Sequence, residues 1–209
     1  MFIAPVDATR GEGEWRPFLE SHPFGHLVVP GGPDRDLPVV VPTQFVLQGD
    51  TAWLHLVRAN PVFGALAENR RVLLSVADDW AFVPSAWKAI GDEDPALGIP
   101  TTYYGAVQLA GTATVYDERT EAGSVAAILR RQLATLQPGV EVADPGRSHA
   151  ARLLGILGIS IAVEQVSAKF KYGGNVDEPH RLAVVERLHQ RGAPGDDAAA
   201  AHVVRRLED

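Results

Sequence analysis

The 209-residue sequence contains no cysteine. This absence excludes disulfide bonds, a thiol nucleophile, thiolate zinc sites and cysteine-bound iron–sulfur clusters. The N-terminal residues carry no basic segment followed by an apolar run. No stretch approaches the ~18–20 uninterrupted apolar residues of a membrane-spanning helix. We therefore expect a soluble, cytoplasmic protein that does not bind membranes.

The familiar catalytic motifs are also absent. The sequence has neither a G-x-G-x-x-G nor a G-x-x-x-x-G-K-[ST] phosphate-binding pattern, and it lacks G-x-S-x-G and H-E-x-x-H. His22 and His26 are four residues apart, but Pro23 and Gly25 interrupt any helix that would place both imidazoles on one face. We predict no metal site, and no side chain can be named as catalytic from the sequence.

Positive charge is scarce. Asp and Glu total 26 against 19 Lys and Arg, which gives a net charge of −7. Without a basic cluster, this balance argues against nucleic-acid binding, where cationic side chains supply most of the affinity. Only three of the basic residues are lysines, namely Lys88, Lys169 and Lys171. Because a compact ammonium differs in chemistry from a planar guanidinium, these three positions are candidates for a specific role.

Apolar residues make up 46% of the chain, which is enough for a buried core. Strands are predicted at 26–29, 38–47, 51–57, 72–76, 81–83, 101–116 and 159–170, and helices at 15–21, 60–68, 120–136, 148–157 and 178–191. Mostly short connections between the strands indicate an antiparallel barrel or sandwich, so the expected fold is mainly β with peripheral helices. Gly111 interrupts the apolar face of 101–116, which predicts a bulge, a bend or a close backbone approach. Residues 1–191 form the predicted domain, and 192–209 are expected to be a linker and a frayed helix.

The first candidate segment contains His55, Leu56, Val57, Arg58 and Asn60. Here a predicted strand runs directly into the N-terminus of a helix, where free backbone N–H groups and the helix dipole favour an anion. Arg58 would add bidentate charge. The alternative is that Asn60 only caps the helix and that Arg58 is solvated.

The second candidate segment combines Ser85, Trp87 and Lys88 with Thr102, Tyr103 and Tyr104, on either side of an acidic loop. Flat aromatic side chains with hydroxyl donors suit a planar heteroaromatic ligand. The alternatives are an aromatic hairpin corner or a subunit interface.

The third candidate segment is Lys169-Phe170-Lys171-Tyr172-Gly173-Gly174-Asn175. On a strand, Lys169 and Lys171 share one face while Phe170 points to the other, towards the core. Two neighbouring cations repel one another, so an anionic partner is favoured. The alternative is a solvated strand end.

Several of these segments resemble one known family. HPFGHLVV, HLVRANPVF, PSAWK, IPTTYYGAVQLAGTATV and KFKYGGN occur in the order found in the PaiB-type FMN-binding split-barrel family, which is similar to pyridoxine phosphate oxidase. The resemblance covers residues 1–191. It implies a six-stranded split β-barrel that forms a homodimer, with FMN held in two clefts between the subunits.

The resemblance also implies roles for the candidate residues. The segment His55 to Asn60 would meet the FMN phosphate and ribityl chain, Tyr103 and Tyr104 would approach the isoalloxazine, and Lys88 or Lys169 would meet the phosphate or the flavin N1. Ser85 and Thr102 complete the implied cofactor-binding set. A cation near N1 raises the potential of a flavin.

We therefore expect an FMN-dependent oxidoreductase that acts on a small organic substrate. One alternative is a PaiB-like transcriptional regulator or interaction protein without catalysis. Another is a haem-binding split barrel that uses His180 or His149 as a ligand. Deazaflavin is a further cofactor option.

Overall fold

A computed structural model describes residues 1–33 and 35–208. Seven strands form one antiparallel sheet in the order β2-β1-β5-β6-β7-β4-β3. Their bounds are β1 Phe24–Val29, β2 Val39–Gln44, β3 Val46–Gln48, β4 Thr51–Val57, β5 Arg71–Val83, β6 Thr101–Tyr116 and β7 Ile156–Lys171.

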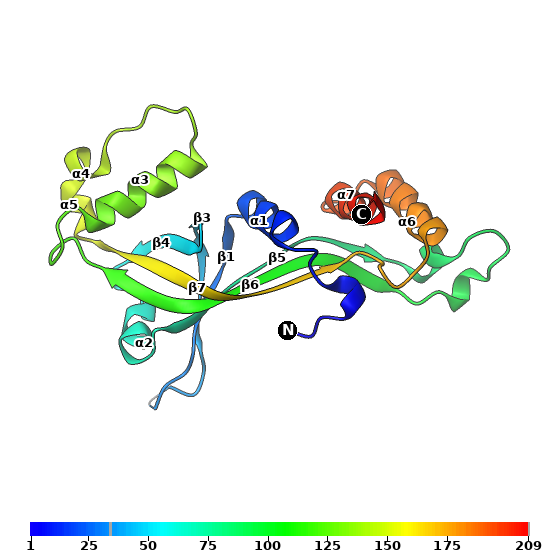
Figure 1. Ribbon diagram of the computed structural model, residues 1–209, viewed down its shortest axis with the longest axis horizontal. Coiled ribbons are helices and arrows are strands. Elements are labelled where there is room, and N and C mark those ends of the chain that lie inside the picture. Colours follow the sequence, from blue (N-terminus) through cyan, green and yellow to red (C-terminus); the bar gives the residue numbers. More distant parts are fainter. Residues whose placement is uncertain (34, 209) are drawn as a thin grey trace. The chain divides into compact units, whose positions relative to one another are not determined.

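The helices accompany this sheet. They are α1 Glu12–Ser21, α2 Val62–Glu68, α3 Ser124–Leu136, α4 Pro145–Ser148, α5 Ala150–Leu153, α6 Glu178–Arg191 and α7 Asp196–Glu208, with short 3₁₀ helices η1 Pro5–Asp7, η2 Ser85–Lys88 and η3 Pro95–Leu97 (Figure 1). In the described residues, no helix is both long and apolar enough to cross a membrane. The predicted class, mainly β with peripheral helices, is confirmed.

The chain divides into two compact units. The first comprises Met1–Phe18, Ala77–Val107 and Ser167–Asp209, and the second comprises Leu19–Val76 and Gln108–Val166. The long strands β5, β6 and β7 each contribute residues to both units.

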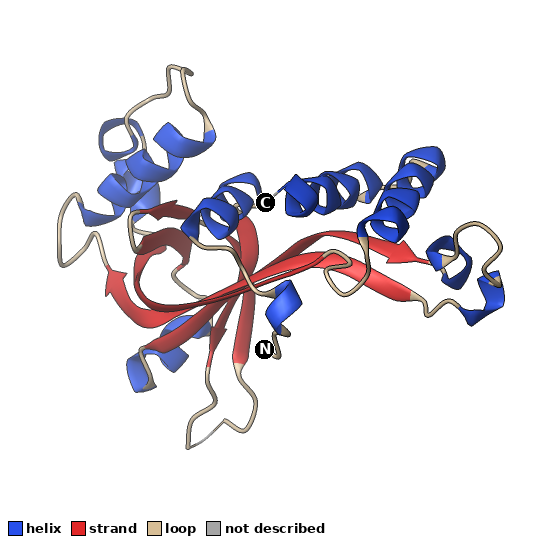
Figure 2. Ribbon diagram, turned by 45° about the vertical axis from the view of Figure 1, so that its right-hand side comes forward, coloured by secondary structure: helices blue, strands red, loops and turns tan. Residues whose placement is uncertain are grey.

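The second unit shows why the sheet is a split barrel. Strands β2 and β3 stand at opposite ends of the sheet order, yet only Phe45 separates them in the chain. The sheet must therefore curl until its two ends meet, and the strands of this unit curve accordingly in Figure 2. The Phe45 side chain is fully buried, and its N–H donates to the Pro23 carbonyl at 2.9 Å. Among the described residues no ladder joins β2 to β3, so the sheet is not closed.

Gly111 shows the predicted close backbone approach. It lies in β6, and a Cβ at this position would overlap the Ala162 carbonyl oxygen of β7. Any residue other than glycine would separate the two strands at this point.

Some predicted elements differ from the structure. Residues 38–47 form two strands instead of one, and 72–76 and 81–83 belong to a single strand, β5. The helix predicted at 148–157 is wrong, because only the short α4 and α5 form there and β7 begins at Ile156. The β-branched Ile156, Ile159 and Ile161 favour a strand, and they pair with the neighbouring strand β4.

The C-terminal helix α7 belongs to the first unit and lies beside α6 (Figure 1). Ala199, Ala200 and Val203 are fully buried, because small side chains allow close packing. Buried Asp196 accepts a hydrogen bond from Arg191 Nε at 2.8 Å. Residues 196–208 are therefore a packed helix, unlike the frayed helix expected from the sequence. Asp209, the last residue of that expected segment, lies outside the described residues.

Candidate functional site

A cavity of about 390 Å³ lies in the first unit, where β6 begins and β7 ends. Its polar walls are contributed by Asp7, Lys88, Thr101, Tyr103, Lys171 and Asn175. Ala4, Val6, Ile99 and Pro100 supply apolar surface. This combination of apolar wall and a few convergent polar groups is typical of small-molecule sites.

Two ammonium groups face this cavity. Lys171 Nζ donates to Thr101 Oγ1 at 2.7 Å. Burial lowers the pKa of Lys88 below its usual value, and the charge of Lys171 lowers that pKa further. The two cations are close enough to repel one another, so an anionic or electron-rich ligand group between them is favoured.

The Tyr103 side chain is almost completely buried, and its hydroxyl has no hydrogen-bond partner among the described residues. Burial raises the pKa of Tyr103 to about 12, against the opposing charge of Arg181. The phenol is therefore a neutral donor at physiological pH. A buried hydroxyl without a partner is costly, and a ligand oxygen or nitrogen in the cavity would satisfy it.

Gly173 leaves space for this hydroxyl. Its φ is +77°, which favours glycine, and a Cβ there would overlap the Tyr103 hydroxyl. Gly173, which follows β7, is thus part of the cavity wall for steric reasons.

Tyr104 and Lys169 lie away from the cavity wall. Lys169 Nζ is 3.7 Å from an Asp7 carboxylate oxygen and donates to the Phe2 carbonyl at 3.2 Å. Lys169 and Lys171 lie 5.6 and 6.0 Å from the centre of the Tyr104 ring. Lys169 and Lys171 therefore flank one face, as predicted, and buried Phe170 points to the other. Lys169 does not line the cavity, but it neutralises the charge of Asp7, which does.

Ser85 and Thr102 are near the cavity in sequence but are not among its lining residues. Ser85 begins η2, and its carbonyl packs against Gly98. Thr102 follows Thr101 on β6 and so points to the opposite face of that strand. The same alternation separates Tyr103 from Tyr104.

The segment from His55 to Asn60 belongs to the second unit. His55, Leu56 and Val57 pair with β7, and His55 Nδ1 is 2.6 Å from Gln132 Oε1. Asn60 Oδ1 accepts the Val62 N–H at 3.0 Å, so this side chain caps α2.

Arg58 is partly exposed, and its guanidinium is paired. Its Nη1 and Nη2 atoms donate to both carboxylate oxygens of Asp117 at 2.6 Å, and its Nε donates to the Leu154 carbonyl at 2.9 Å. The guanidinium lowers the pKa of Asp117 to about 2. A phosphate at Arg58 would have to exchange with this carboxylate.

The two histidines considered as haem ligands differ. His180 Nδ1 is 2.6 Å from Asp177, and its Nε2 is 3.0 Å from Glu93. Both ring nitrogens are engaged, and these carboxylates raise the pKa of His180. His149 lies in the second unit, and no side-chain hydrogen bond holds its imidazole among the described residues.

Of the residues that line the cavity, only Lys88 and Tyr103 belong to the predicted cofactor-binding set. The lining residues outside that set are Ala4, Val6, Asp7, Ile99, Pro100, Thr101, Lys171, Gly173 and Asn175. Lys171, Gly173 and Asn175 belong to the third candidate segment, so the scarcity of lysine and the adjacent glycines could have identified them. Asp7 gives no signal, because nothing in the sequence indicates that η1 reaches β7.

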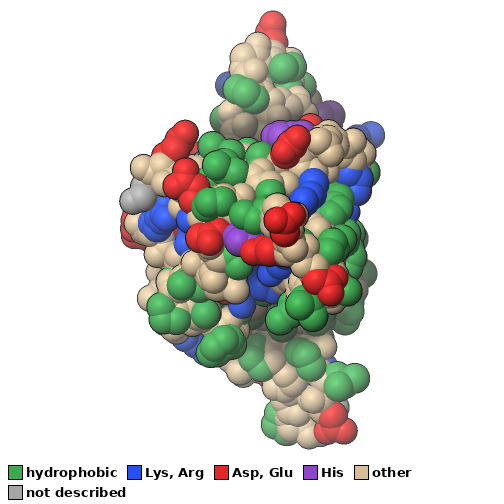
Figure 3. All heavy atoms as spheres, turned by 90° about the vertical axis from the view of Figure 1, so that its right-hand side faces the viewer, with side chains coloured by type: hydrophobic (Ala, Val, Ile, Leu, Met, Phe, Trp, Pro, Cys, Tyr) green, Lys and Arg blue, Asp and Glu red, His purple; other side chains and the backbone are tan. Residues whose placement is uncertain are grey.

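The surface seen in Figure 3 carries acidic, basic and histidine side chains interspersed among hydrophobic ones. That face presents no continuous strip of basic side chains of the kind that tracks a nucleic-acid backbone.

Comparison with solved structures shows the same fold. Conserved hypothetical protein Rv2991 from Mycobacterium tuberculosis has a TM-score of 0.59 at 15% identity, over 85% of this chain and 95% of that one. The FAD and heme binding protein from Mycobacterium smegmatis also has a TM-score of 0.59, at 19% identity over 85% and 79% of the two chains. The flavocytochrome Anf3 from Azotobacter vinelandii has a TM-score of 0.57 at 23% identity, over 84% and 74%.

Sequence comparison identifies the family. The Bacillus subtilis protein named "Protease synthase and sporulation protein PAI 2" is 24% identical over 190 residues, which cover 89% of this chain and 87% of that protein. The family described as "Putative FMN-binding domain" matches residues 1–165. The chain therefore belongs to this FMN-binding family, and it is a split-barrel protein of the PaiB type.

Proposed function

We propose that the cavity of the first unit holds the flavin ring of FMN and that the protein is an oxidoreductase acting on a small organic substrate. The observation that carries this proposal is Tyr103, whose side chain lines a cavity flanked by Lys88 and Lys171 and whose buried hydroxyl has no partner among the described residues. A flavin ring offers both the flat apolar surface and the edge of acceptor atoms that such a cavity fits.

The side chains have distinct roles in this proposal. Tyr103 donates a hydrogen bond to an acceptor on the ring edge, and Lys88 and Lys171 supply positive charge beside it. The apolar wall residues Ile99 and Pro100 exclude water from the ring. When bound, FMN supplies the hydride and electron transfer itself, so the chain needs no nucleophile of its own.

The residues of the second unit enter this proposal through the family resemblance. His55 to Asn60 would meet the phosphate and ribityl chain of FMN in a homodimer. Arg58 would then exchange Asp117 for the phosphate, because both anions suit the same bidentate guanidinium.

The test begins with protein purified without added cofactor. Its absorbance spectrum and a titration with FMN should show saturable binding at micromolar or lower concentration. Lys171→Met should weaken FMN binding roughly tenfold or more, because a charge-assisted contact is lost. Arg71→Met is the matched control, since that exposed cation pairs with Glu164 in the second unit and does not line the cavity.

A colourless protein that does not bind FMN saturably would refute the proposal. So would equal FMN affinities for the wild-type protein and Lys171→Met. If FMN binds but neither reduced nicotinamide nucleotides nor small organic acceptors change its spectrum under anaerobic conditions, the oxidoreductase part is wrong. That result would instead favour a PaiB-like regulator or interaction protein that binds FMN.

A further inference from the structure

A second cavity, of about 490 Å³, lies in the second unit and is lined mainly by apolar side chains. It is bounded by α3, the loop 137–144, the short helices α4 and α5, and the first residue of β7. Its apolar walls come from Leu129, Leu133, Val142, Pro145, Leu153 and Ile156. Leu153 is buried, and Leu129 and Ile156 pack against the core cluster around it, so the cavity floor belongs to the core.

Three polar residues also line this cavity. His149 and Arg152 line it, as does Gln137. In the described part of the chain, the side chains of His149 and Arg152 form no hydrogen bond and no ion pair. Most other arginines of this protein bind a carboxylate or a backbone carbonyl, as Arg58 and Arg130 do. An unpaired guanidinium above an apolar cavity is complementary to a ligand that has an anionic end and an apolar body.

The loop 137–144 contributes exposed apolar side chains beside this cavity. Its Val140 and Val142 are 58% and 41% exposed, although both are apolar. A further cavity, of about 470 Å³, is also lined by residues of this loop. It shares Leu133, Gln137 and Val142 with the 490 Å³ cavity. Asp144 fixes the end of this loop, accepting from Arg130 Nε at 2.7 Å and capping α4.

We propose that this cavity is a second ligand site, which binds a medium-chain carboxylate. Its hydrocarbon chain would lie against the leucines of α3 and α5, and its carboxylate would pair with Arg152 beside His149. Ligand binding would also bury the exposed valines of the loop. The site lies in the second unit and involves none of the residues proposed to bind the flavin ring, so it does not depend on the proposed function.

The test is calorimetric titration of the full-length, FMN-treated protein with hexanoate, octanoate and decanoate. Affinity should rise roughly fourfold for each added methylene until the cavity is filled. Decanol, which has the same length without the charge, should bind more weakly than decanoate. Arg152→Gln should weaken decanoate binding roughly tenfold, since a charged hydrogen bond is lost. The matched control Arg147→Gln, an exposed arginine on α4 outside the lining set, should leave the affinity unchanged.

Filling the cavity provides an independent arm. Leu133→Trp should abolish decanoate binding while the circular dichroism spectrum and the FMN affinity stay as in the wild type. Ala143→Trp, which fills the cavity from the loop side, serves if Leu133→Trp does not fold. Undiminished decanoate binding by a folded filled variant would overturn the proposal. Equal affinities for decanol and decanoate would also overturn it, because the anionic end would then play no part.

One competing ligand has to be distinguished. Haem also combines an apolar body with carboxylates, and His149 lines this cavity. The probe is haemin, with the Soret band as the readout. Absence of a specific shift, or a shift that decanoate reverses, supports the carboxylate site. A shift that decanoate does not reverse and that His149→Ala abolishes would overturn the proposal in favour of haem.

Discussion

At the scale of single residues, the lysines give the clearest signal. The chain has only three, and all of them lie in the first unit. Lys88 and Lys171 line the cavity, and Lys169 neutralises Asp7, which also lines it. All other cationic side chains of this sequence, apart from histidine, are arginines. A lysine at the cavity provides a compact ammonium where an arginine would provide a planar guanidinium.

The proposed role of Lys88 predicts that FMN affinity depends on pH. Burial and the neighbouring Lys171 lower the pKa of Lys88, so it loses its proton at a lower pH than an ordinary lysine. The charged form binds the ligand, so FMN affinity should fall as pH rises through this lowered pKa. Fluorescence titrations from about pH 7 to about pH 10 would measure the fall. Lys88→Arg should remove it, because a guanidinium stays charged over this range. An unchanged pH profile in that variant would contradict the assignment.

Tyr103 predicts opposite effects on stability and on binding. Its unpartnered buried hydroxyl costs about 1–3 kcal/mol in the protein without ligand. Tyr103→Phe should therefore leave the free energy of unfolding unchanged or raise it, while FMN binds less tightly. Denaturant unfolding and FMN titration measure the two quantities.

Tyr172→Phe is the control for this prediction. The Tyr172 hydroxyl donates to the Asp79 carbonyl at 3.1 Å, so its removal should lower stability by about 1 kcal/mol. If Tyr103→Phe lowers stability as much as Tyr172→Phe does, the Tyr103 hydroxyl has a partner within the protein and is not available to a ligand.

At the scale of elements, the sequence predicts those with a strong periodic pattern. Residues 51–57, 101–116 and 178–191 have the predicted type and bounds, because alternation or helical spacing persists along their whole length. The single helix predicted at 148–157 does not form, because helix α5 ends at Leu153 and Ile156 and Leu157 pair with β4. The site was predicted only in part. Alternation along β6 places Tyr103 at the cavity and Tyr104 on the other face, but no local pattern brings Asp7 to β7.

The turn after β7 tests the cavity wall. Gly173 and Gly192 both have positive φ, at +77° and +61°. An alanine at Gly192 meets only the His189 carbonyl at 3.9 Å, so Gly192→Ala should cost about 1–2 kcal/mol from the backbone alone. Gly173→Ala should cost more and should also impair FMN binding, because its methyl group would displace Tyr103. Equal costs for the two variants, measured by denaturant unfolding, would contradict the tight packing at Gly173.

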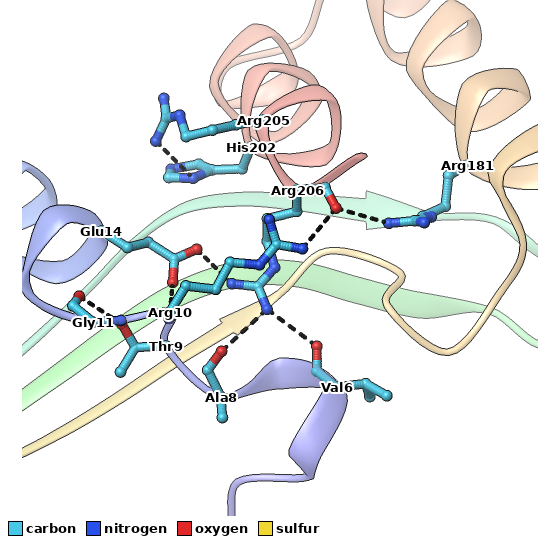
Figure 4. Close-up of polar contacts among 10 residues, drawn as sticks. All are labelled: Val6, Ala8, Thr9, Arg10, Gly11, Glu14, Arg181, His202, Arg205 and Arg206. Atoms are coloured by element: carbon cyan, nitrogen blue, oxygen red, sulfur yellow. Dashed lines mark hydrogen bonds and ion pairs between the residues drawn. The ribbon is translucent and has the colours of Figure 1, made fainter. Parts of the chain in front are cut away.

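Helix α7 is fixed by an arginine at its C-terminal end. Figure 4 shows Arg206 paired with Glu14, and both side chains are buried. Arg206 Nη2 also donates to the carbonyls of Val6 and Ala8 at 3.1 Å. Arg206→Met would remove the guanidinium from the buried Glu14 carboxylate, which would keep the hydrogen bond from the Arg10 N–H, so the free energy of unfolding should fall by about 3 kcal/mol. Arg205→Met, one residue away, loses only a long contact to His202 and should cost much less.

At the scale of the whole molecule, the proposed cofactor residues belong to two compact units. The homodimer proposal holds that His55 to Asn60 of one subunit and the cavity of its partner serve the same FMN. A twofold axis would then create two equivalent sites, each built from both chains. Single-chain variants cannot test this, because a defect in either segment impairs both sites.

Mixed dimers can test it. Arg58→Gln and Lys171→Met are each expected to weaken FMN binding as homodimers. If the two chains are unfolded together and refolded, half of the dimers should be mixed, and each mixed dimer should contain one intact site and one with both defects. FMN binding should then return at roughly a quarter of all sites. Arg119→Gln replaces Arg58→Gln in the control, because Arg119 also donates to the Leu154 carbonyl. The Arg119→Gln homodimer should bind FMN as the wild-type protein does, before any mixing. If mixing restores no sites although mixed dimers form, each FMN is held by residues of a single chain, because only then does every site carry one of the two defects.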